Sequence, residues 1–267
     1  MIIPHKFWES LLKALAVYAV FLVIAWLLSF AINDEVDRRI LLAINPDTRM
    51  PVLDEFFIGI TDFSMALIGA LAIGWEIGFI VYRKSQKDAK KASKILQIIG
   101  GVAGTVFLMG TWLFGYVLWG IFPVLALVTW GAFWVISQSY DQLSEKEMIV
   151  FQKIIFLMLL TALFSVTGEY IIKYVVRRPR PLNDANASWN WALTVFADET
   201  VRGSYSYFSG HSSGLFAGLT PLAWGVKSKK SKLFLWMWAG FHAFSRIYVA
   251  AHRSEEHTSE LQSPNTI

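Results

Sequence analysis

The run ILQIIGGVAGTVFLMGTWLFGYVLWGIFPVLALVTWGAFWVISQ, residues 95–138, contains no charged side chain over 44 positions. A helix that crosses a membrane needs about 20 mostly apolar residues, because backbone groups in hydrocarbon must bond to one another. The run is too long for one crossing, and Gly120-Ile121-Phe122-Pro123 is a natural turn. We therefore predict two membrane-spanning helices joined at this turn.

The composition of the whole chain agrees with a membrane protein. Of its 267 residues 55% are hydrophobic and 16% are charged, whereas soluble domains carry roughly 25% charged residues. This excludes a disordered, coiled-coil or collagen-like chain and argues against a soluble enzyme. Cysteine is absent, which excludes a thiolate nucleophile and a Cys-ligated zinc. We predict an all-α fold, a polytopic transmembrane helical bundle of about seven spans.

Five further apolar runs supply the other spans: Leu11–Ile32 as an uncleaved anchor, Phe57–Tyr82, Met148–Ile172, Ser212–Val226 and Leu233–Ala251. Basic residues gather in the loops after the second and sixth spans, and such loops are cytoplasmic. The N-terminus is then cytoplasmic, and the 173–211 loop lies on the extracytoplasmic side. We expect the protein to reside in the cell membrane. These basic runs lie between apolar segments, so we predict no nucleic-acid partner.

Three polar clusters fall at the extracytoplasmic ends of the fifth, sixth and seventh spans. Lys173–Pro181 reads Lys-x6-Arg-Pro, Ser209–His211 reads Ser-Gly-His, and Ser245–His252 reads Ser-Arg-x5-His. Lysine and arginine bind phosphate dianions, and the start of a helix favours an anion. Of two histidines, one can attack phosphorus while the other protonates the leaving group. The clusters therefore predict attack on a phosphate ester, with cations in place of a metal.

In this order, the three motifs resemble the type 2 phosphatidic acid phosphatase family, an integral-membrane lipid phosphatase superfamily. The resemblance covers about 173–252, with a weaker echo over 53–63. It implies that His252 is the nucleophile forming a phosphohistidine and that His211 is the general acid. It also implies a phosphate-binding set of Lys173, Arg180, Ser209, Gly210 and Arg246.

Two polar residues beside the motifs have ordinary alternatives. Glu169 lies four residues before Lys173, on the same helix face, and could support that lysine or serve packing alone. His242 lies one helical turn before Arg246 in an apolar run, and we predict that it is structural.

The expected function is hydrolysis of a lipid phosphate or pyrophosphate, without cofactor or metal, at the extracytoplasmic face. Phosphatidic acid, phosphatidylglycerol phosphate and undecaprenyl pyrophosphate are candidate substrates, and membrane lipids are the other expected partners. The oligomeric state stays open. One alternative is a lipid phosphotransferase that uses the same site. Another is a non-catalytic transporter or lipid-binding protein, with Asp62, Glu76 and Glu169 as its ion pathway.

The end of the chain departs from the family pattern. The last motif of the family continues His-x3-Asp, but position 256 is Glu256. Arg253–Ser263 reads RSEEHTSELQS, which is the translation of a common sequencing adapter. We therefore expect a membrane-embedded phosphatase domain over 1–252 and a non-native tail over 253–267. The native aspartate and a final span would then be missing from this sequence.

Overall fold

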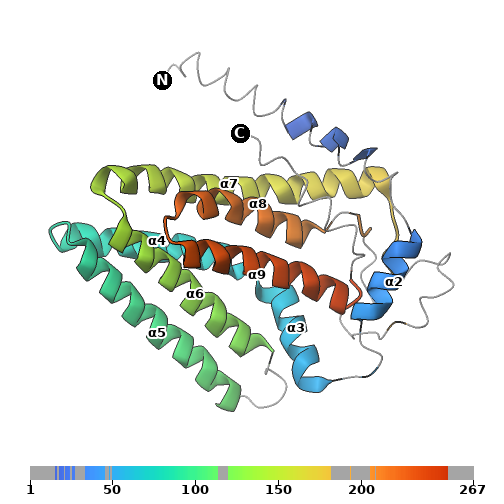
Figure 1. The fold of residues 1–267 in the computed structure, drawn as a ribbon, viewed down its shortest axis with the longest axis horizontal. Helices are drawn as coiled ribbons and strands as arrows, with labels where there is room; N and C mark the ends of the chain where they lie inside the picture. The colour runs from blue at the N-terminus through green and yellow to red at the C-terminus, as the bar shows by residue number, and fades with distance from the viewer. Residues whose placement is uncertain are drawn as a thin grey trace.

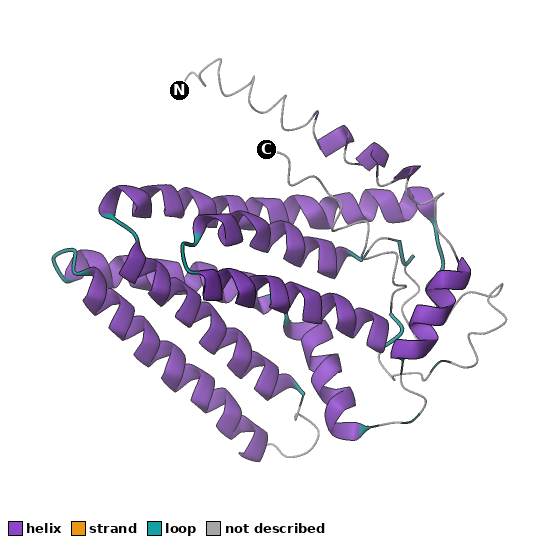
Figure 2. Cartoon of the chain, viewed as in Figure 1, coloured by secondary structure: helices purple, strands orange, loops and turns teal. Residues whose placement is uncertain are grey.

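A computed structural model describes most of the chain as helices (Figures 1 and 2). No strand occurs in the described part, so the all-α prediction is confirmed. Among the residues that the structure describes, four helices are long and apolar enough to cross a membrane: α4 (Ala66–Lys84), α5 (Ala89–Leu113), α6 (Ile121–Gln142) and α7 (Glu145–Val176). The described residues are 16, 18–20, 22–24, 26–27, 34–45, 48, 50–113, 120–181, 193, 205–207 and 209–251.

Helices α5 and α6 form the hairpin predicted from the uncharged run. Glycines on α5 let the two helices approach closely, because a Cβ atom at Gly104 would lie 2.1 Å from Nε1 of Trp130. Small residues at helix contacts are the usual means of close packing in membranes. Gly120 is the N-cap of α6, and the other three residues of the predicted turn, Ile121, Phe122 and Pro123, form the first turn of this helix. The predicted turn is therefore wrong in its position, and residues 114–119, which connect α5 to Gly120, lie outside the described residues.

The span predicted over Phe57–Tyr82 is wrong in its boundaries. The structure divides this run into α3 (Pro51–Phe63) and α4, with a break at Ser64 and Met65. The apolar composition continues through the break, and so hydropathy does not reveal it. With 13 residues α3 is too short to cross a membrane. It lies instead against the end of α9 (Lys229–Tyr248) and the start of α6, where a Cβ at Gly120 would lie 1.8 Å from the Glu55 carbonyl oxygen.

The last two predicted spans correspond to α8 (Gly210–Gly225) and α9, but neither is among the four long apolar helices. Helix α8 has only 16 residues and packs along α7, where Thr161 donates a hydrogen bond to the Ala217 carbonyl at 2.9 Å. In α9 the polar residues of the third motif and its basic start lower the hydropathy. The predicted first span lies largely outside the described residues, and α2 (Asp34–Ile44) follows it.

The core of the bundle fixes how the helices are arranged around the motifs. Trp75 of α4 stacks on Tyr140 of α6, with ring centroids 4.9 Å apart, and contacts Phe151 of α7 at 4.7 Å. Figure 1 shows that α7 ends, α8 begins and α9 ends at one end of this bundle, beside α2 and α3. The three motifs therefore meet at that end.

Candidate active site

The first motif starts in the last turn of α7, which ends at a sharp change of direction. Arg177 adopts φ 52°, and its backbone N–H donates to the Lys173 carbonyl at 2.9 Å. The prolines at 179 and 181 cannot continue a helix, and proline also disfavours helical geometry in the residue before it. Lys173 is 8% exposed, and its ammonium group forms an ion pair with the Glu169 carboxylate.

The second motif opens α8. Ser209 is its N-cap, and the Ser209 hydroxyl accepts from the Ser212 backbone N–H at 3.5 Å and donates to the Ser212 hydroxyl at 3.1 Å. The first backbone N–H groups of a helix have no partner within it and attract anions. A Cβ on Gly210 would lie 1.4 Å from Oε2 of Glu169. Position 210 is therefore a glycine because a carboxylate of α7 occupies the space beside it.

The third motif ends α9 in a reversing turn. Ala250 adopts φ 54°, its N–H donates to the Ile247 carbonyl at 2.9 Å, and the Ala251 N–H donates to the Arg246 carbonyl at 3.0 Å. This pair of hydrogen bonds is the Schellman helix end. Arg180, which is 5% exposed, donates from Nη1 to the Ala251 carbonyl at 2.9 Å. The turn thus brings the end of α9 to the first motif.

Arg246 is almost fully buried, with 1% of its surface exposed. Its neighbour Ser245 accepts a hydrogen bond from Thr61 of α3 at 2.9 Å and donates to the His242 carbonyl at 2.7 Å. The hydroxyl of Tyr248 donates to Asp54 of α3 at 2.8 Å. Residues of the weaker echo over 53–63 therefore hold the end of α9, a role that sequence reasoning did not assign to them.

The two described histidines of the site face each other. His211 is exposed, His242 is fully buried, and their ring centroids are 6.4 Å apart. Nδ1 of His242 bonds to the Ser64 hydroxyl and lies 3.3 Å from the Ile60 carbonyl oxygen. From the sequence we predicted a structural role for His242, and its burial fits that role. The sequence did not predict that His242 lies beside His211. The spacing of one helical turn from Arg246 was the available signal.

The proposed nucleophile, His252, lies outside the described residues, as does the tail over 253–267. Its predecessor Ala251 is described and is held by Arg180. Within the described ranges, no group of three or more His, Cys, Asp and Glu side chains is placed to hold a metal ion.

A comparison with protein families matches residues 153–254 to the PAP2 superfamily. Comparisons of the chain with curated proteins and with solved structures gave no match. The matched segment includes most of α7, all of α8 and α9, and all three motifs. Members of this superfamily are phosphatases, and the four long apolar helices indicate a membrane protein. Residues 153–254 of this chain are therefore similar to the PAP2 superfamily, a family of phosphatases.

Proposed function

We propose that this protein hydrolyses a phosphate or pyrophosphate monoester of a membrane lipid through a phosphohistidine on His252, without a metal. The observation that carries the proposal is that three helix ends lie at one end of the bundle (Figure 1): the last turn of α7 with Lys173, the start of α8, and the last turn of α9 with Arg246. Arg180 joins this group through its hydrogen bond to Ala251.

The electrostatics of this end suit a bound phosphate. Lys173, Arg180 and Arg246 are all buried, and buried cations cost free energy unless anions or hydrogen-bond acceptors accompany them. A phosphate group would bring charge and several acceptor oxygens to the three cations. The N–H groups at the start of α8 would add hydrogen bonds whose direction favours an anion.

The reaction then has two steps. In the first, a neutral His252 imidazole nitrogen forms a bond to phosphorus, the bond from phosphorus to the lipid oxygen breaks, and His211 gives its proton to that oxygen. In the second, water attacks phosphorus, His211 takes a proton from the water, and the bond from phosphorus to nitrogen breaks. The exposed position of His211 supports its access to the leaving group.

Lipid phosphates are the proposed substrates because the site lies at the end of apolar helices. Phosphatidic acid, phosphatidylglycerol phosphate and undecaprenyl pyrophosphate share a phosphate on an apolar tail, which could remain in the bilayer during turnover. We place this end of the bundle at the extracytoplasmic face, on the basis of the basic loops at 83–94 and 227–232.

The test is phosphate release from these three lipids by the full chain in mixed micelles, with and without EDTA. Because the family pattern has Asp where this chain has Glu256, the Glu256→Asp variant is assayed beside it. We expect release that is insensitive to EDTA and abolished by His211→Ala and by His252→Ala. The proposal would be overturned by release that EDTA inhibits or by near-normal rates in either histidine variant. It would also be overturned if neither the full chain nor the Glu256→Asp variant released phosphate from any of the lipids. Transfer of phosphate to a lipid alcohol would instead identify the phosphotransferase.

A further inference from the structure

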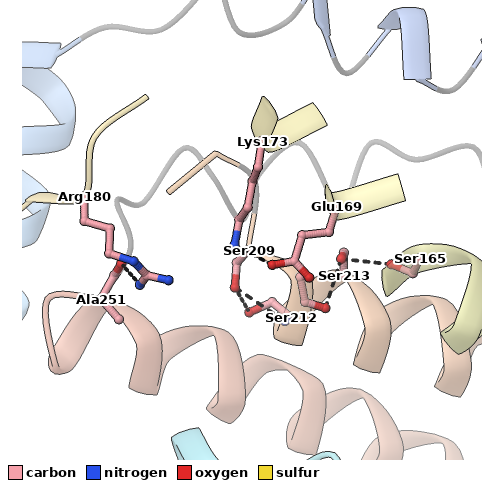
Figure 3. Close-up of polar contacts among 9 residues, drawn as sticks. Ser165, Glu169, Lys173, Arg180, Ser209, Ser212, Ser213 and Ala251 are labelled. Atoms are coloured by element: carbon pink, nitrogen blue, oxygen red, sulfur yellow. Dashed lines mark hydrogen bonds and ion pairs between the residues drawn. The ribbon is translucent and has the colours of Figure 1, made fainter. Parts of the chain in front are cut away.

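The carboxylate of Glu169 faces Lys173 (Figure 3) and also lies against Gly210, the first residue of α8. Its Oε1 forms the ion pair with Lys173. A Cβ built on Gly210 would lie 1.4 Å from Oε2 and 2.4 Å from Oε1, so both oxygens lie against this residue. The Glu169 side chain is only 13% exposed. One carboxylate therefore contacts two of the residues that we assign to phosphate binding.

The surroundings of this carboxylate are those of an anion site. A helix start and a lysine ammonium group recognise a carboxylate and a phosphate by the same donors and the same charge. Two anions a few ångströms apart in a site of low dielectric repel strongly. Glu169 in its present position and a phosphate on Lys173 and Gly210 would therefore exclude one another.

We propose that Glu169 is an internal anion, which fills the phosphate position in the resting protein and moves aside when substrate binds. This inference rests on the proposed function, because it takes Lys173 and Gly210 as phosphate ligands. In the resting state the carboxylate neutralises a buried lysine. The affinity for phosphate is then the balance between binding the substrate and displacing Glu169.

Two hydroxyl groups near Glu169 are hydrogen-bonding partners for the displaced carboxylate. Ser165 lies one turn before Glu169 on the same face of α7, and its hydroxyl donates to the Ser213 hydroxyl of α8 at 2.9 Å. Ser213 in turn donates to the Gly210 carbonyl at 3.2 Å. Figure 3 shows this hydroxyl pair beside Glu169, on the side away from Lys173. After a change of side-chain rotamer, the carboxylate could accept hydrogen bonds from these hydroxyls, which would turn away from their present acceptors, Ser213 and the Gly210 carbonyl.

Glu169 could compete with phosphate as an internal anion, or it could only position Lys173. These two roles predict opposite effects of Glu169→Gln on phosphate binding. The substitution keeps the size of the side chain and removes its charge. If Glu169 competes with phosphate, the Kd of phosphate falls, by about tenfold for the loss of one close charge. If Glu169 serves only to hold Lys173 in place for substrate, the Kd rises.

The experiment titrates the full chain in detergent with inorganic phosphate by calorimetry and follows KM and kcat on a lipid phosphate. The matched control is Glu35→Gln on α2. Hydrogen bonds from Arg38 and Arg39 lower the pKa of Glu35 to about 2, so this variant also removes one full negative charge. We expect a lower phosphate Kd and a lower KM in Glu169→Gln, with kcat not raised, and no change beyond twofold in Glu35→Gln.

An unchanged or higher phosphate Kd in a folded Glu169→Gln protein would overturn the internal anion. If that variant does not fold, Glu169→Asp replaces it. The shorter side chain keeps the charge but cannot contact both Lys173 and Gly210, so a smaller fall in Kd is expected and an increase would contradict us. If the unsubstituted chain hydrolyses lipid phosphate but the phosphate Kd does not fall in Glu169→Gln, this inference alone is wrong. Absence of both phosphate binding and hydrolysis in every variant would sink the proposed function as well.

Discussion

Arg180 donates a hydrogen bond from Nη1 to the carbonyl oxygen of Ala251 at 2.9 Å, across 71 positions of the chain. Both residues are buried. Arg180 belongs to the first motif, and Ala251 is the residue directly before His252. An arginine assigned to phosphate therefore also fastens the segment that leads to the proposed nucleophile.

This link predicts that Arg180 cannot be replaced by lysine. Arg180→Lys keeps the charge but loses the planar group that can hold the Ala251 carbonyl and a phosphate together. We expect kcat to fall by about tenfold or more, measured as phosphate release from a lipid phosphate. The control is Arg177→Lys, because Arg177 is exposed, and it should stay within twofold. Equal rates for the two variants would show that the hydrogen bond has no part in turnover.

The contact between Glu169 and Gly210 predicts a specific steric effect. Gly210→Ala places a methyl group on the carboxylate and should lower the free energy of unfolding by about 1–3 kcal/mol, the usual cost of overpacking. Gly240→Ala on α9 meets no atom within 4 Å and should be neutral or slightly stabilising. Thermal unfolding in detergent measures both.

The same contact is tested by a double variant. Glu169→Ala removes the clashing group, and so Gly210→Ala should cost little in that background. A cost that is the same with and without Glu169 would mean that the carboxylate is not beside Gly210.

The hydrogen bond from Tyr248 to the buried Asp54 predicts that α3 stabilises the end of α9. Tyr248→Phe removes the hydroxyl donor and should cost about 1–3 kcal/mol of stability, because hydrogen bonds to charged or buried groups are among the stronger ones. Tyr170→Phe, at an exposed position, should be neutral. Unfolding midpoints in detergent and denaturant would show the difference. If Tyr248→Phe unfolded at the same midpoint as Tyr170→Phe, α3 would not stabilise the end of α9 through this hydrogen bond.

The predicted topology has its own test. A tag inserted near Asn186, in the 173–211 loop, should react with a membrane-impermeant reagent in intact cells, and a tag near Lys90 should not. The reverse pattern would place the site on the cytoplasmic side.

The sequence predicted those parts of the fold that follow directly from apolar length. An uncharged run of 44 residues requires two helices, and α5 and α6 are found there. The break at Ser64 and Met65 was missed, because the hydropathy of a run carries no information on its direction. Helices α8 and α9 lie where spans were predicted. The short length of α8 and the polar residues of α9 set them apart from the four apolar helices.

In the candidate site, too, the sequence predicted a contact within one helix but not the contacts between distant segments. The pairing of Glu169 with Lys173 follows from a spacing of four residues on a helix, and it was one of the two readings left open. The contact of Glu169 with Gly210 and that of Thr61 with Ser245 join distant segments, and no local pattern encodes them. His211 and His242 face each other for the same reason. Tertiary packing, rather than motif spacing, brings these pairs together.

The measurement that tests the central claim most directly is detection of the phosphohistidine itself. The full chain and its Glu256→Asp variant are mixed with a lipid carrying radiolabelled phosphate, quenched in alkali and detergent, and digested to locate the label. We predict a label that is stable in alkali and labile in acid, on the peptide that contains His252, and absent in His252→Ala. Turnover without any label on His252, or a label that persists in His252→Ala, would contradict the account.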